Sequence, residues 1–503
     1  MLSRLLVRGG VLIIPMFKTH FTLLGNWAFG GNVLSFIDAA NENVSLNMHY
    51  PRLFISLFIL QFSLVFGGLA AAERPNVIII YTDDQGTMDL GCYGSDDLAT
   101  PHLDRLASRG VRFKQMYSPS AICSASRAGL LTGRFPARAG VPGNVSSEEG
   151  VPGMSASEVT IAEMMQAAGY TTGHIGKWHL GYTPDTMPNN QGFDYSWGHM
   201  GGCIDNYSHF FFWKGPNRHD LWRNGEYIFE DGFFFQDSMV REMNDFITRN
   251  KEKPFFIYWA LNSPHYPLQG DAKWREYYKD LPSPRGKYNA FVSTLDERIG
   301  QMLEHLEAMG LTEKTLVIFQ SDHGHSTEER AFFGGGSAGI YRGAKGCLFE
   351  GGIRVPSIVS LPGVIPENEV REQLATGVDW LPTIADLCSI ELPDRHLDGK
   401  SIKEVILSKS APSPHETFYW HLGGGKNPEW VVRDGDWKLH GNPKDRSNKA
   451  PITEADQPFL ANLAMDPTEM TNLAPKYPEV VERLAAMQAE YVASIEDSLA
   501  KGE

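Results

Sequence analysis

The chain has 503 residues, of which 42% are hydrophobic and 21% are charged, so it can bury a large core and is not a disordered protein. Its formal net charge of −15 repels polyphosphates and excludes a general nucleic-acid-binding protein. An anionic ligand therefore has to meet a local positive pocket.

The N-terminal part predicts export. A short basic start at Arg52 precedes an apolar run over residues 53–66 and three alanines before Glu73, which together have the form of a secretory signal. The run is shorter than the ~20 residues of a membrane-spanning helix, so we expect cleavage near Glu73, no stable membrane span afterwards, and a periplasmic or secreted protein. A signal belongs at the N-terminus, and we therefore interpret 48–72 as the signal peptide and 1–47 as an over-extended reading frame.

Four segments of strand length each lead into polar residues. Residues 76–81 precede Asp83 and Asp84, 171–176 precede Lys177 and His179, 255–260 precede His265, and 315–320 precede Asp322 and His323. Near-continuous apolar runs are typical of strands that are buried on both faces. Because functional groups gather beyond the carboxyl ends of such strands, we expect these side chains to be neighbours.

Helices are predicted between the strands. Thr100 and Pro101 form the start of one helix, and Thr160 with Glu163 forms a capping box for another. A longer helix has an apolar face that ends before Gly310. The sequence thus predicts an α/β fold with a large mixed, mostly parallel sheet sandwiched by helices, over residues 73–409.

The pattern changes after residue 409. A linker-like run at 410–416 is followed by short segments, with a hairpin signal at Asp434-Gly435, and by a terminal amphipathic helix. Residues 410–503 are therefore predicted to form a smaller antiparallel sheet plus helix.

Two features carry chemistry. Asp83-Asp84 and Asp322-His323 bring together carboxylates that repel one another unless a cation lies between them, and oxygen ligands favour calcium or magnesium. Cys123 stands before a predicted helix, where free backbone N–H groups favour an anion, with Arg127 one turn further on. The alternative is a buried structural cysteine. The chain has five cysteines and no C-x-x-C pair, so a cysteine zinc site is not expected.

Residues 123–134, CSASRAGLLTGR, resemble the signature of type I sulfatases, members of the alkaline phosphatase superfamily. The resemblance continues through PNVIIIYTDD, GKWHLG, NSPHYPLQ, SDHG and RGAKGCLFEGGIRVP, and so covers most of the chain after residue 73. It implies an alkaline-phosphatase-like fold and hydrolysis of sulfate monoesters. It also implies that a maturation enzyme oxidises Cys123 to Cα-formylglycine, whose hydrate is the nucleophile.

The resemblance further implies a role for each matching residue. Calcium is bound by Asp83, Asp84, Asp322, His323 and the modified Cys123. Arg127 and Lys177 hold the formylglycine and sulfate, and His179 acts on its hydroxyl. His265 and Lys345 grip the sulfate and the leaving oxygen. Two positions depart from the usual pattern: Ala125 stands where most members have proline, and His323 stands where asparagine is frequent.

The segment 201–225 is rich in aromatic and hydrogen-bonding side chains. One interpretation is a platform for a sulfated saccharide, and the other is a small satellite core. The residues predicted to contact substrate are Asp205, Asn206, His209, His219 and, from the C-terminal part, His421. Two alternatives to a saccharide sulfatase stay open: a phosphonate or phosphodiester hydrolase of the same superfamily, and an inactive saccharide-binding relative.

Overall fold

The computed structural model describes residues 74–212, 217–447 and 449–502. The extension expected at 1–47 and the signal peptide expected at 48–72 lie outside these residues. In the described part, no helix is both long enough and apolar enough to cross a membrane.

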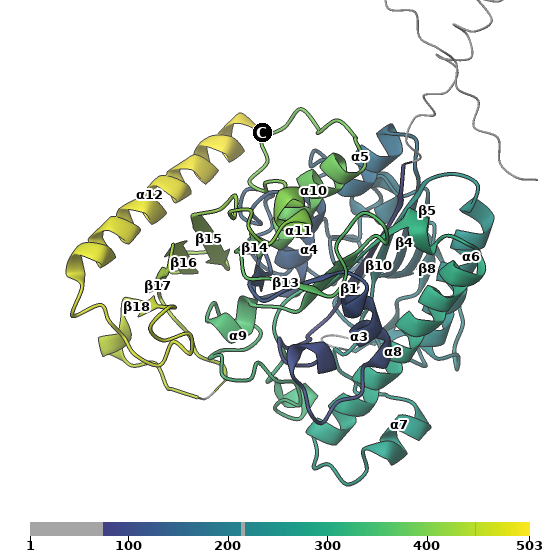
Figure 1. The fold of residues 1–503 in the computed structure, drawn as a ribbon, viewed down its shortest axis with the longest axis horizontal. Helices are drawn as coiled ribbons and strands as arrows, with labels where there is room; N and C mark the ends of the chain where they lie inside the picture. The colour runs from purple at the N-terminus through teal and green to yellow at the C-terminus, as the bar shows by residue number, and fades with distance from the viewer. Residues whose placement is uncertain (1–73, 213–216, 448, 503) are drawn as a thin grey trace, which may run out of the picture. The chain divides into compact units, whose positions relative to one another are not determined.

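A ten-stranded mixed sheet forms the centre of the fold, in the order β13-β2-β12-β11-β1-β10-β4-β5-β8-β9 (Figure 1). Its middle strands β11, β1, β10, β4 and β5 run parallel, and antiparallel strands join on both sides. The four predicted strands are confirmed as neighbours in this parallel part. The strands are β1 (Asn76–Thr82), β2 (Val111–Phe113), β4 (Thr171–Lys177), β5 (Tyr195–His199), β8 (Trp222–Arg223), β9 (Glu226–Tyr227), β10 (Phe255–Ala260), β11 (Thr315–Ser321), β12 (Ser357–Ser360) and β13 (Glu369–Arg371).

Both faces of the sheet are buried. Along β1, Val77, Ile79 and Tyr81 belong to one apolar cluster, whereas Ile78 and Ile80 belong to another. Successive residues of a strand point to opposite faces of the sheet, so the continuous apolar run of β1 is explained by helices that cover both faces. The first face packs against α4 (Cys123–Thr132), α5 (Ile161–Ala167) and α10 (Trp380–Leu387), and the second against α3 (Pro101–Ser108), α6 (Phe235–Asn250) and α8 (Arg285–Ala308).

Two helix starts show what the sequence could and could not specify. The capping box of α5 is confirmed, because Glu163 N donates to Thr160 Oγ1 at 3.1 Å and Thr160 N donates to Glu163 Oε2 at 2.7 Å. Helix α3 begins after Thr100 as predicted, but its side chain does not cap the helix. Asp296 of α8 does so instead, accepting from the backbone of His102 and Leu103. A cap supplied by a distant helix leaves no local signal.

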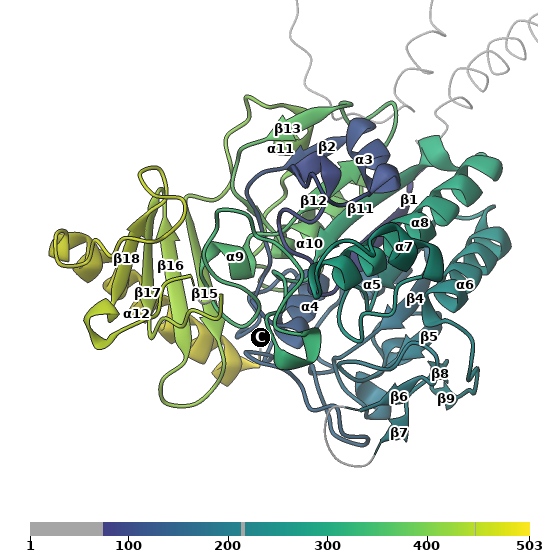
Figure 2. The same ribbon diagram turned by 90° about the horizontal axis from the view of Figure 1, so that it is seen from below.

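The C-terminal part carries a four-stranded antiparallel sheet, with the predicted hairpin turn at Gly435, and a long final helix (Figure 2). It shares an apolar cluster with the large sheet region, in which Phe135 packs edge-on against Phe418 and Tyr491. Its elements are β15 (Thr417–Leu422), β16 (Glu429–Asp434), β17 (Trp437–Gly441), β18 (Phe459–Asn462) and α12 (Pro478–Lys501).

Short elements fill the connections. The remaining strands are β3 (Met116–Tyr117), β6 (Phe210–Phe211), β7 (Arg218–His219) and β14 (Ala375–Thr376), and the remaining α-helices are α7 (Ala272–Tyr277), α9 (Glu350–Ile353) and α11 (Lys403–Leu407).

Candidate active site

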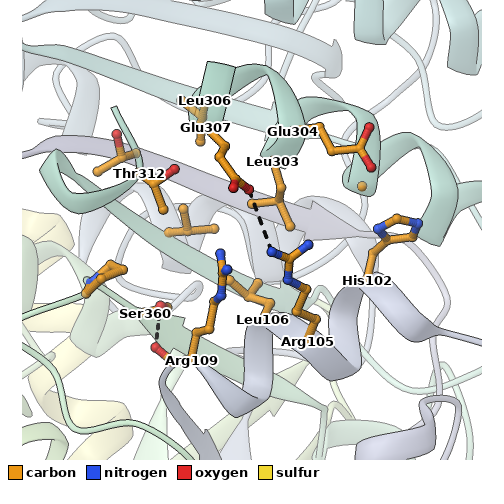
Figure 3. A pocket seen from close by; sticks show the side chains of 14 residues that line it. His102, Arg105, Leu106, Arg109, Leu303, Glu304, Leu306, Glu307, Thr312 and Ser360 are labelled. Atoms are coloured by element: carbon orange, nitrogen blue, oxygen red, sulfur yellow. Dashed lines mark hydrogen bonds and ion pairs between the residues drawn. The ribbon is translucent and has the colours of Figure 1, made fainter. Parts of the chain in front are cut away.

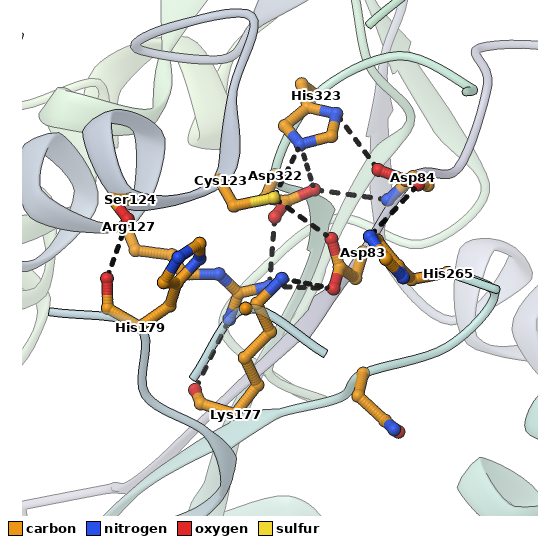
Figure 4. Close-up of polar contacts among 12 residues, drawn as sticks. Asp83, Asp84, Cys123, Ser124, Arg127, Lys177, His179, His265, Asp322 and His323 are labelled. Atoms are coloured by element: carbon orange, nitrogen blue, oxygen red, sulfur yellow. Dashed lines mark hydrogen bonds and ion pairs between the residues drawn. The ribbon is translucent and has the colours of Figure 1, made fainter. Parts of the chain in front are cut away.

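Three carboxylates meet where the parallel strands end. Asp83 and Asp84 follow β1, and Asp322 follows the neighbouring β11, so adjacent strands place them together (Figure 4). Asp322 Oδ1 accepts from the backbone N of Asp84 at 3.2 Å. Asp84 has a positive φ of 68°, which aspartate tolerates better than most residues and which turns the chain back at the site.

His323 and Cys123 complete this cluster. His323 Nε2 lies 3.3 Å from Cys123 Sγ and 3.4 Å from Asp322 Oδ1, and Cys123 Sγ lies 3.6 Å from Asp83 Oδ1. Ligand atoms of Asp83, Asp84, Cys123 and His323 all lie within 4.8 Å of one another. The sequence-based prediction placed these five side chains in one site, and the structure brings them together.

Cys123 is the first residue of α4, and every residue of this helix is buried. Ser124 fixes the start of the helix, because its hydroxyl donates to the carbonyl of His179 at 2.7 Å and accepts from Val145 N at 3.0 Å. The first turn is therefore held against the loop after β4 and against the loop that contains Val145. The thiol of Cys123 points toward the carboxylates of Asp83 and Asp322 (Figure 4).

Three cations, of which Arg127 and Lys177 are fully buried and Lys345 is 10% exposed, surround the carboxylates. Lys177, the last residue of β4, lies 2.6 Å from Asp83 Oδ2. Arg127, one turn along α4, lies 2.9 Å from Asp322 Oδ2. Lys345 Nζ lies 2.8 Å from Asp84 Oδ1. Each cation thus has a carboxylate partner, as buried charges such as Arg127 and Lys177 require.

The acid groups differ in their affinity for protons. Burial raises the pKa of Asp84 to about 8 although Lys345 opposes it, and burial together with Asp83 raises the pKa of Asp322 to about 6. Burial is also the largest influence on Asp83, but Lys177 and the other basic neighbours together outweigh it and hold the pKa of that carboxyl well below its usual value. The basic side chains therefore stabilise the ionised form of Asp83, whereas ionisation of Asp84 and Asp322 stays unfavourable without further positive charge.

The donor set fits a hard divalent cation. Carboxylate oxygens predominate, and two of the carboxylates resist ionisation without more positive charge, which is what calcium or magnesium supplies. The thiol also responds to its surroundings: burial opposes ionisation, but Lys177 and Lys345 lower the pKa of Cys123 to about 6. The site therefore stabilises an anionic atom at this position.

Two histidines lie at the edge of the cluster. His265 Nδ1 lies 2.8 Å from the carbonyl of Tyr266, so this nitrogen donates, and Nε2 lies 3.7 Å from Asp84 Oδ2. His179 Nε2 lies 3.4 Å from Ser147 Oγ. Burial lowers the pKa of both rings well below the usual value, followed in effect by Lys345 for His265 and by Lys177 for His179. Both rings therefore favour the neutral form.

A cavity of about 300 Å³ opens onto Cys123. The sequence-based prediction identified Cys123, His179, His265 and Lys345 among the residues that line it, but missed others from four loops and from β6. These are Asn144, Val145, Ser146, Ser147, Glu148, Gly202, Cys203, Phe211, Tyr266 and Glu328. They carry no periodic pattern, although the polar run SSEE at 146–149 was a weak local signal.

The five residues predicted to contact substrate do not line this cavity in the described part of the chain. Asn206 instead bonds to Gln269 and Asn262, and Asp205 accepts from Gln269. His421 lies on β15 of the C-terminal sheet, opposite Trp430. His209 and His219 form a separate group beside β6 and β7. Among the described residues of the segment 201–225, only Gly202, Cys203 and Phe211 reach the cavity wall.

A second cavity lies between α3 and α8 (Figure 3). Thr315, at the start of β11, lines it, so it is at the opposite end of this strand from Asp322. Its volume is only about 40 Å³, and its ion pair between Arg105 and Glu307 is largely exposed. This cavity is too small for a substrate.

The fold and the site define the class: an α/β enzyme that holds an anionic group at the carboxyl ends of parallel strands, beside a nucleophile position and a cation site. Comparison with known proteins gives the family. Residues 75–390 match the Sulfatase family, and residues 338–493 match the family described as N-sulphoglucosamine sulphohydrolase, C-terminal.

Similar proteins agree. Human (Homo sapiens) arylsulfatase A is 33% identical over 462 residues, covering 84% of this chain and 88% of the relative. Steryl-sulfatase of Rattus norvegicus is 30% identical, covering 84% and 90%. The crystal structure of Ps i-CgsB in complex with k-i-k-neocarrahexaose matches with a TM-score of 0.74 and 26% identity, covering 83% of this chain and 93% of that one.

The chain therefore belongs to the sulfatase family and is a sulfuric ester hydrolase. The predicted fold class is confirmed as well, including the small C-terminal sheet.

Proposed function

We propose that this protein is an exported, calcium-dependent sulfatase that hydrolyses sulfate esters of a saccharide, using formylglycine made from Cys123 as its nucleophile. The observation that carries the proposal is the position of Cys123: the first residue of a buried helix, within one cluster of carboxylates and cations, at the floor of a cavity. Export is inferred from the signal-like segment 48–72 alone.

Cys123 is the group to be converted. In this structure its Sγ stands for the oxygen that the modified side chain carries, and hydrated formylglycine supplies an oxygen nucleophile at that position. The chain's contribution is to hold this atom: Ser124 anchors the helix start, and Lys177 and Lys345 stabilise negative charge there. A formylglycine-generating enzyme is the implied partner, and it must accept Ala125 at the position where proline is usual.

Asp83, Asp84, Asp322 and His323 would hold the metal ion, together with the modified residue. A bound calcium ion supplies positive charge next to the nucleophile and the sulfate. Their carboxylates are fixed before any ion arrives, because each already contacts a buried cation or a backbone N–H. Little reorganisation is then needed on binding.

Arg127, Lys177 and Lys345 bind the sulfate group. A sulfate monoester spreads its charge over three oxygens, so several cationic donors on different sides recognise it. These three come from α4, from the end of β4 and from the loop before α9, and they therefore approach from separate directions. Burial of Arg127 and Lys177 removes competing water and strengthens their contacts.

The two histidines move protons. His265 keeps its Nδ1 proton on the carbonyl of Tyr266, which leaves Nε2 to take up a proton when the negative sulfate binds nearby and to pass it to the leaving alcohol. His179 is neutral, so it is a base that can remove a proton from the hydroxyl of the modified residue. Ser147 orients this ring from the cavity side.

The cavity favours a small cyclic alcohol portion. Its volume of about 300 Å³ is at the lower limit for small-molecule sites, and Phe211 and Tyr266 give it aromatic surface beside polar groups. A saccharide ring has the matching alternation of apolar faces and hydroxyls. The complex of Ps i-CgsB with k-i-k-neocarrahexaose supports this substrate class.

Cys123→Ala tests the proposal, with Cys203→Ala as the matched control because Cys203 is a second buried cysteine on the same cavity. We expect Cys123→Ala to fold normally and to lose turnover of both an aryl sulfate and sulfated oligosaccharides, while Cys203→Ala retains most of it. Mass spectrometry of the tryptic peptide 115–127 should show an aldehyde in place of the thiol.

Three results would contradict the proposal. Retained turnover in Cys123→Ala excludes the nucleophile. A purely thiol-bearing peptide in an inactive protein favours a saccharide-binding relative. Faster turnover of a matching phosphodiester than of the sulfate favours the phosphodiester hydrolase.

A further inference from the structure

A second group of metal-ligating side chains lies away from the active site, beside the short strands β6 and β7. His209 directly precedes β6, and His219 ends β7, opposite Phe210 in the antiparallel pair. Asp231 comes from the turn between β9 and α6, which Gly232 N ties to the carbonyl of Tyr207 at 2.7 Å. One ring nitrogen of each histidine and one carboxylate oxygen of Asp231 lie within 4.8 Å of one another. Figure 2 shows β6 and β7 beside β8 and β9.

His209 is fully buried, and its tautomer is fixed. Its Nε2 lies 3.1 Å from the carbonyl of Phe233, and a carbonyl only accepts, so Nε2 carries the proton. Nδ1 then has a free lone pair, and it is buried without a hydrogen-bond partner among the described residues. Burial, followed by His219, lowers the pKa of this ring and keeps it neutral. A neutral imidazole whose other nitrogen is anchored to a carbonyl is the usual form of a metal ligand.

His219 is paired with another member of the group. Its Nε2 lies 3.1 Å from Asp231 Oδ1, a hydrogen bond that a shared metal ion would replace, and its Nδ1 is buried with no partner in the part of the chain that the structure describes. The side chain is only 9% exposed, although the residue lies at the end of a short strand. Phe229 stacks on the ring at 4.5 Å and Phe210 meets it edge-on, so aromatic contacts hold the imidazole in one orientation.

We propose that His209, His219 and Asp231 bind a zinc ion, as a centre separate from the carboxylate site at Cys123. Two imidazoles and one carboxylate form a ligand set that suits zinc, whereas calcium prefers oxygen ligands alone. Zinc bonds of ~2.1 Å place tetrahedral ligands about 3.4 Å apart, so the side chains need to close by at most about 1.4 Å. The Asp231 side chain, 56% exposed, is free to make that adjustment.

The zinc centre fastens the β6–β7 hairpin to the turn before α6. This matters for the cavity, because Phe211 of β6 lines its wall. In a two-residue strand pair, few backbone hydrogen bonds hold the hairpin, so one metal crosslink changes its stability strongly. None of the three ligands lines the cavity or belongs to the carboxylate site.

The test measures zinc binding in the full chain with the active site disabled. In a Cys123→Ala, Asp84→Asn background, stripped with a chelator and supplied with calcium, we expect one equivalent of zinc per chain by calorimetry and elemental analysis. Adding His219→Ala should abolish this binding, and adding Asp231→Asn should weaken it at least about 10-fold.

The matched control is His396→Ala, which removes an exposed histidine 3.4 Å from a single aspartate, Asp398. It should bind zinc like the background. Asp231 is exposed, so its variant folds even if the loss of His219 does not permit folding; circular dichroism checks each protein. Zinc should also slow amide exchange over residues 209–212 and 217–219. The proposal is overturned if the background protein takes up no zinc, or if zinc uptake after Asp231→Asn and after His219→Ala is the same as in the background. Neither result affects the assignment of Cys123.

Discussion

Lys177→Met gives the sharpest test of how the active site is held together. Lys177 Nζ lies 2.6 Å from Asp83 Oδ2, and both side chains are completely buried. Methionine fills nearly the same space, so the main effect is an unpaired buried carboxylate, which costs about 3–5 kcal/mol of the free energy of unfolding. Calcium bound to Asp83 would replace the lost positive charge. We therefore expect a large destabilisation in chelator and a much smaller one in saturating calcium, measured by calorimetry.

Activity should not recover with calcium. Lys177 is also a proposed donor to the sulfate, and removal of one such donor lowers kcat about 10²–10³-fold in comparable sites. Lys438→Met is the matched control: it removes another completely buried lysine, 2.9 Å from both Glu350 and Glu469, in the C-terminal sheet. Its loss of stability should be the same with and without calcium. If Lys177→Met loses equal stability in calcium and in chelator, the metal does not reach Asp83.

Three further changes test other parts of the account. Burial raises the pKa of Glu429 to about 7, so the folded chain holds the proton of this carboxyl group more tightly than the unfolded chain does. The resulting contribution to the free energy of unfolding, up to about 3 kcal/mol, is lost as the pH rises from 4.5 through 7. Glu429→Gln keeps the bond from Leu348 N and should therefore gain in melting temperature on the unmodified chain between pH 5 and 8. His265→Ala should lower turnover of alkyl or sugar sulfates far more than that of an aryl sulfate, whose leaving group needs no proton; equal losses would exclude the acid role. Gly198→Ala should cost more than about 4 kcal/mol in urea unfolding, because its Cβ would lie 1.8 Å from Gly176 O.

The strand ends were predictable from the sequence because a buried parallel strand appears as a continuous apolar run that ends where the strand ends. Residues 76–81 and 315–320 are apolar almost throughout, and the first charged residues after each run are Asp83 and Asp322. Neighbouring parallel strands in register then put these residues side by side, so spacing along the chain translates into proximity. The same reasoning located Lys177 at the end of β4.

Loops that line the cavity show no comparable pattern in the sequence. Glu328, which lies 3.3 Å from Lys345 and lines the cavity, is one acidic residue in a polar run, and nothing in its spacing distinguishes it from Glu329. The segment after β5 misled in the opposite direction: its histidines looked like substrate contacts, but the hairpin directs His209 into a buried position away from the cavity. Tertiary paths decide such positions, and periodicity carries no information about them.

Charge balance explains why an acidic chain can bind an anion. Arg127 and Lys177 are fully buried and Lys345 is only 10% exposed, so each needs a partner, and the carboxylates that pair them also repel one another. The pKa of Asp84 reflects that repulsion. Burial raises this pKa most, Lys345 lowers it, and the neighbouring Asp83 raises it further, to about 8. A divalent cation bound to these carboxylates would remove the repulsion and would leave the three basic groups with charge to spare for a sulfate. On the proposed function, the same carboxylates pair the cations when no metal is bound and release their charge when a metal binds, so the affinity for the anion would rise with metal binding and the affinity for the metal would rise equally with anion binding.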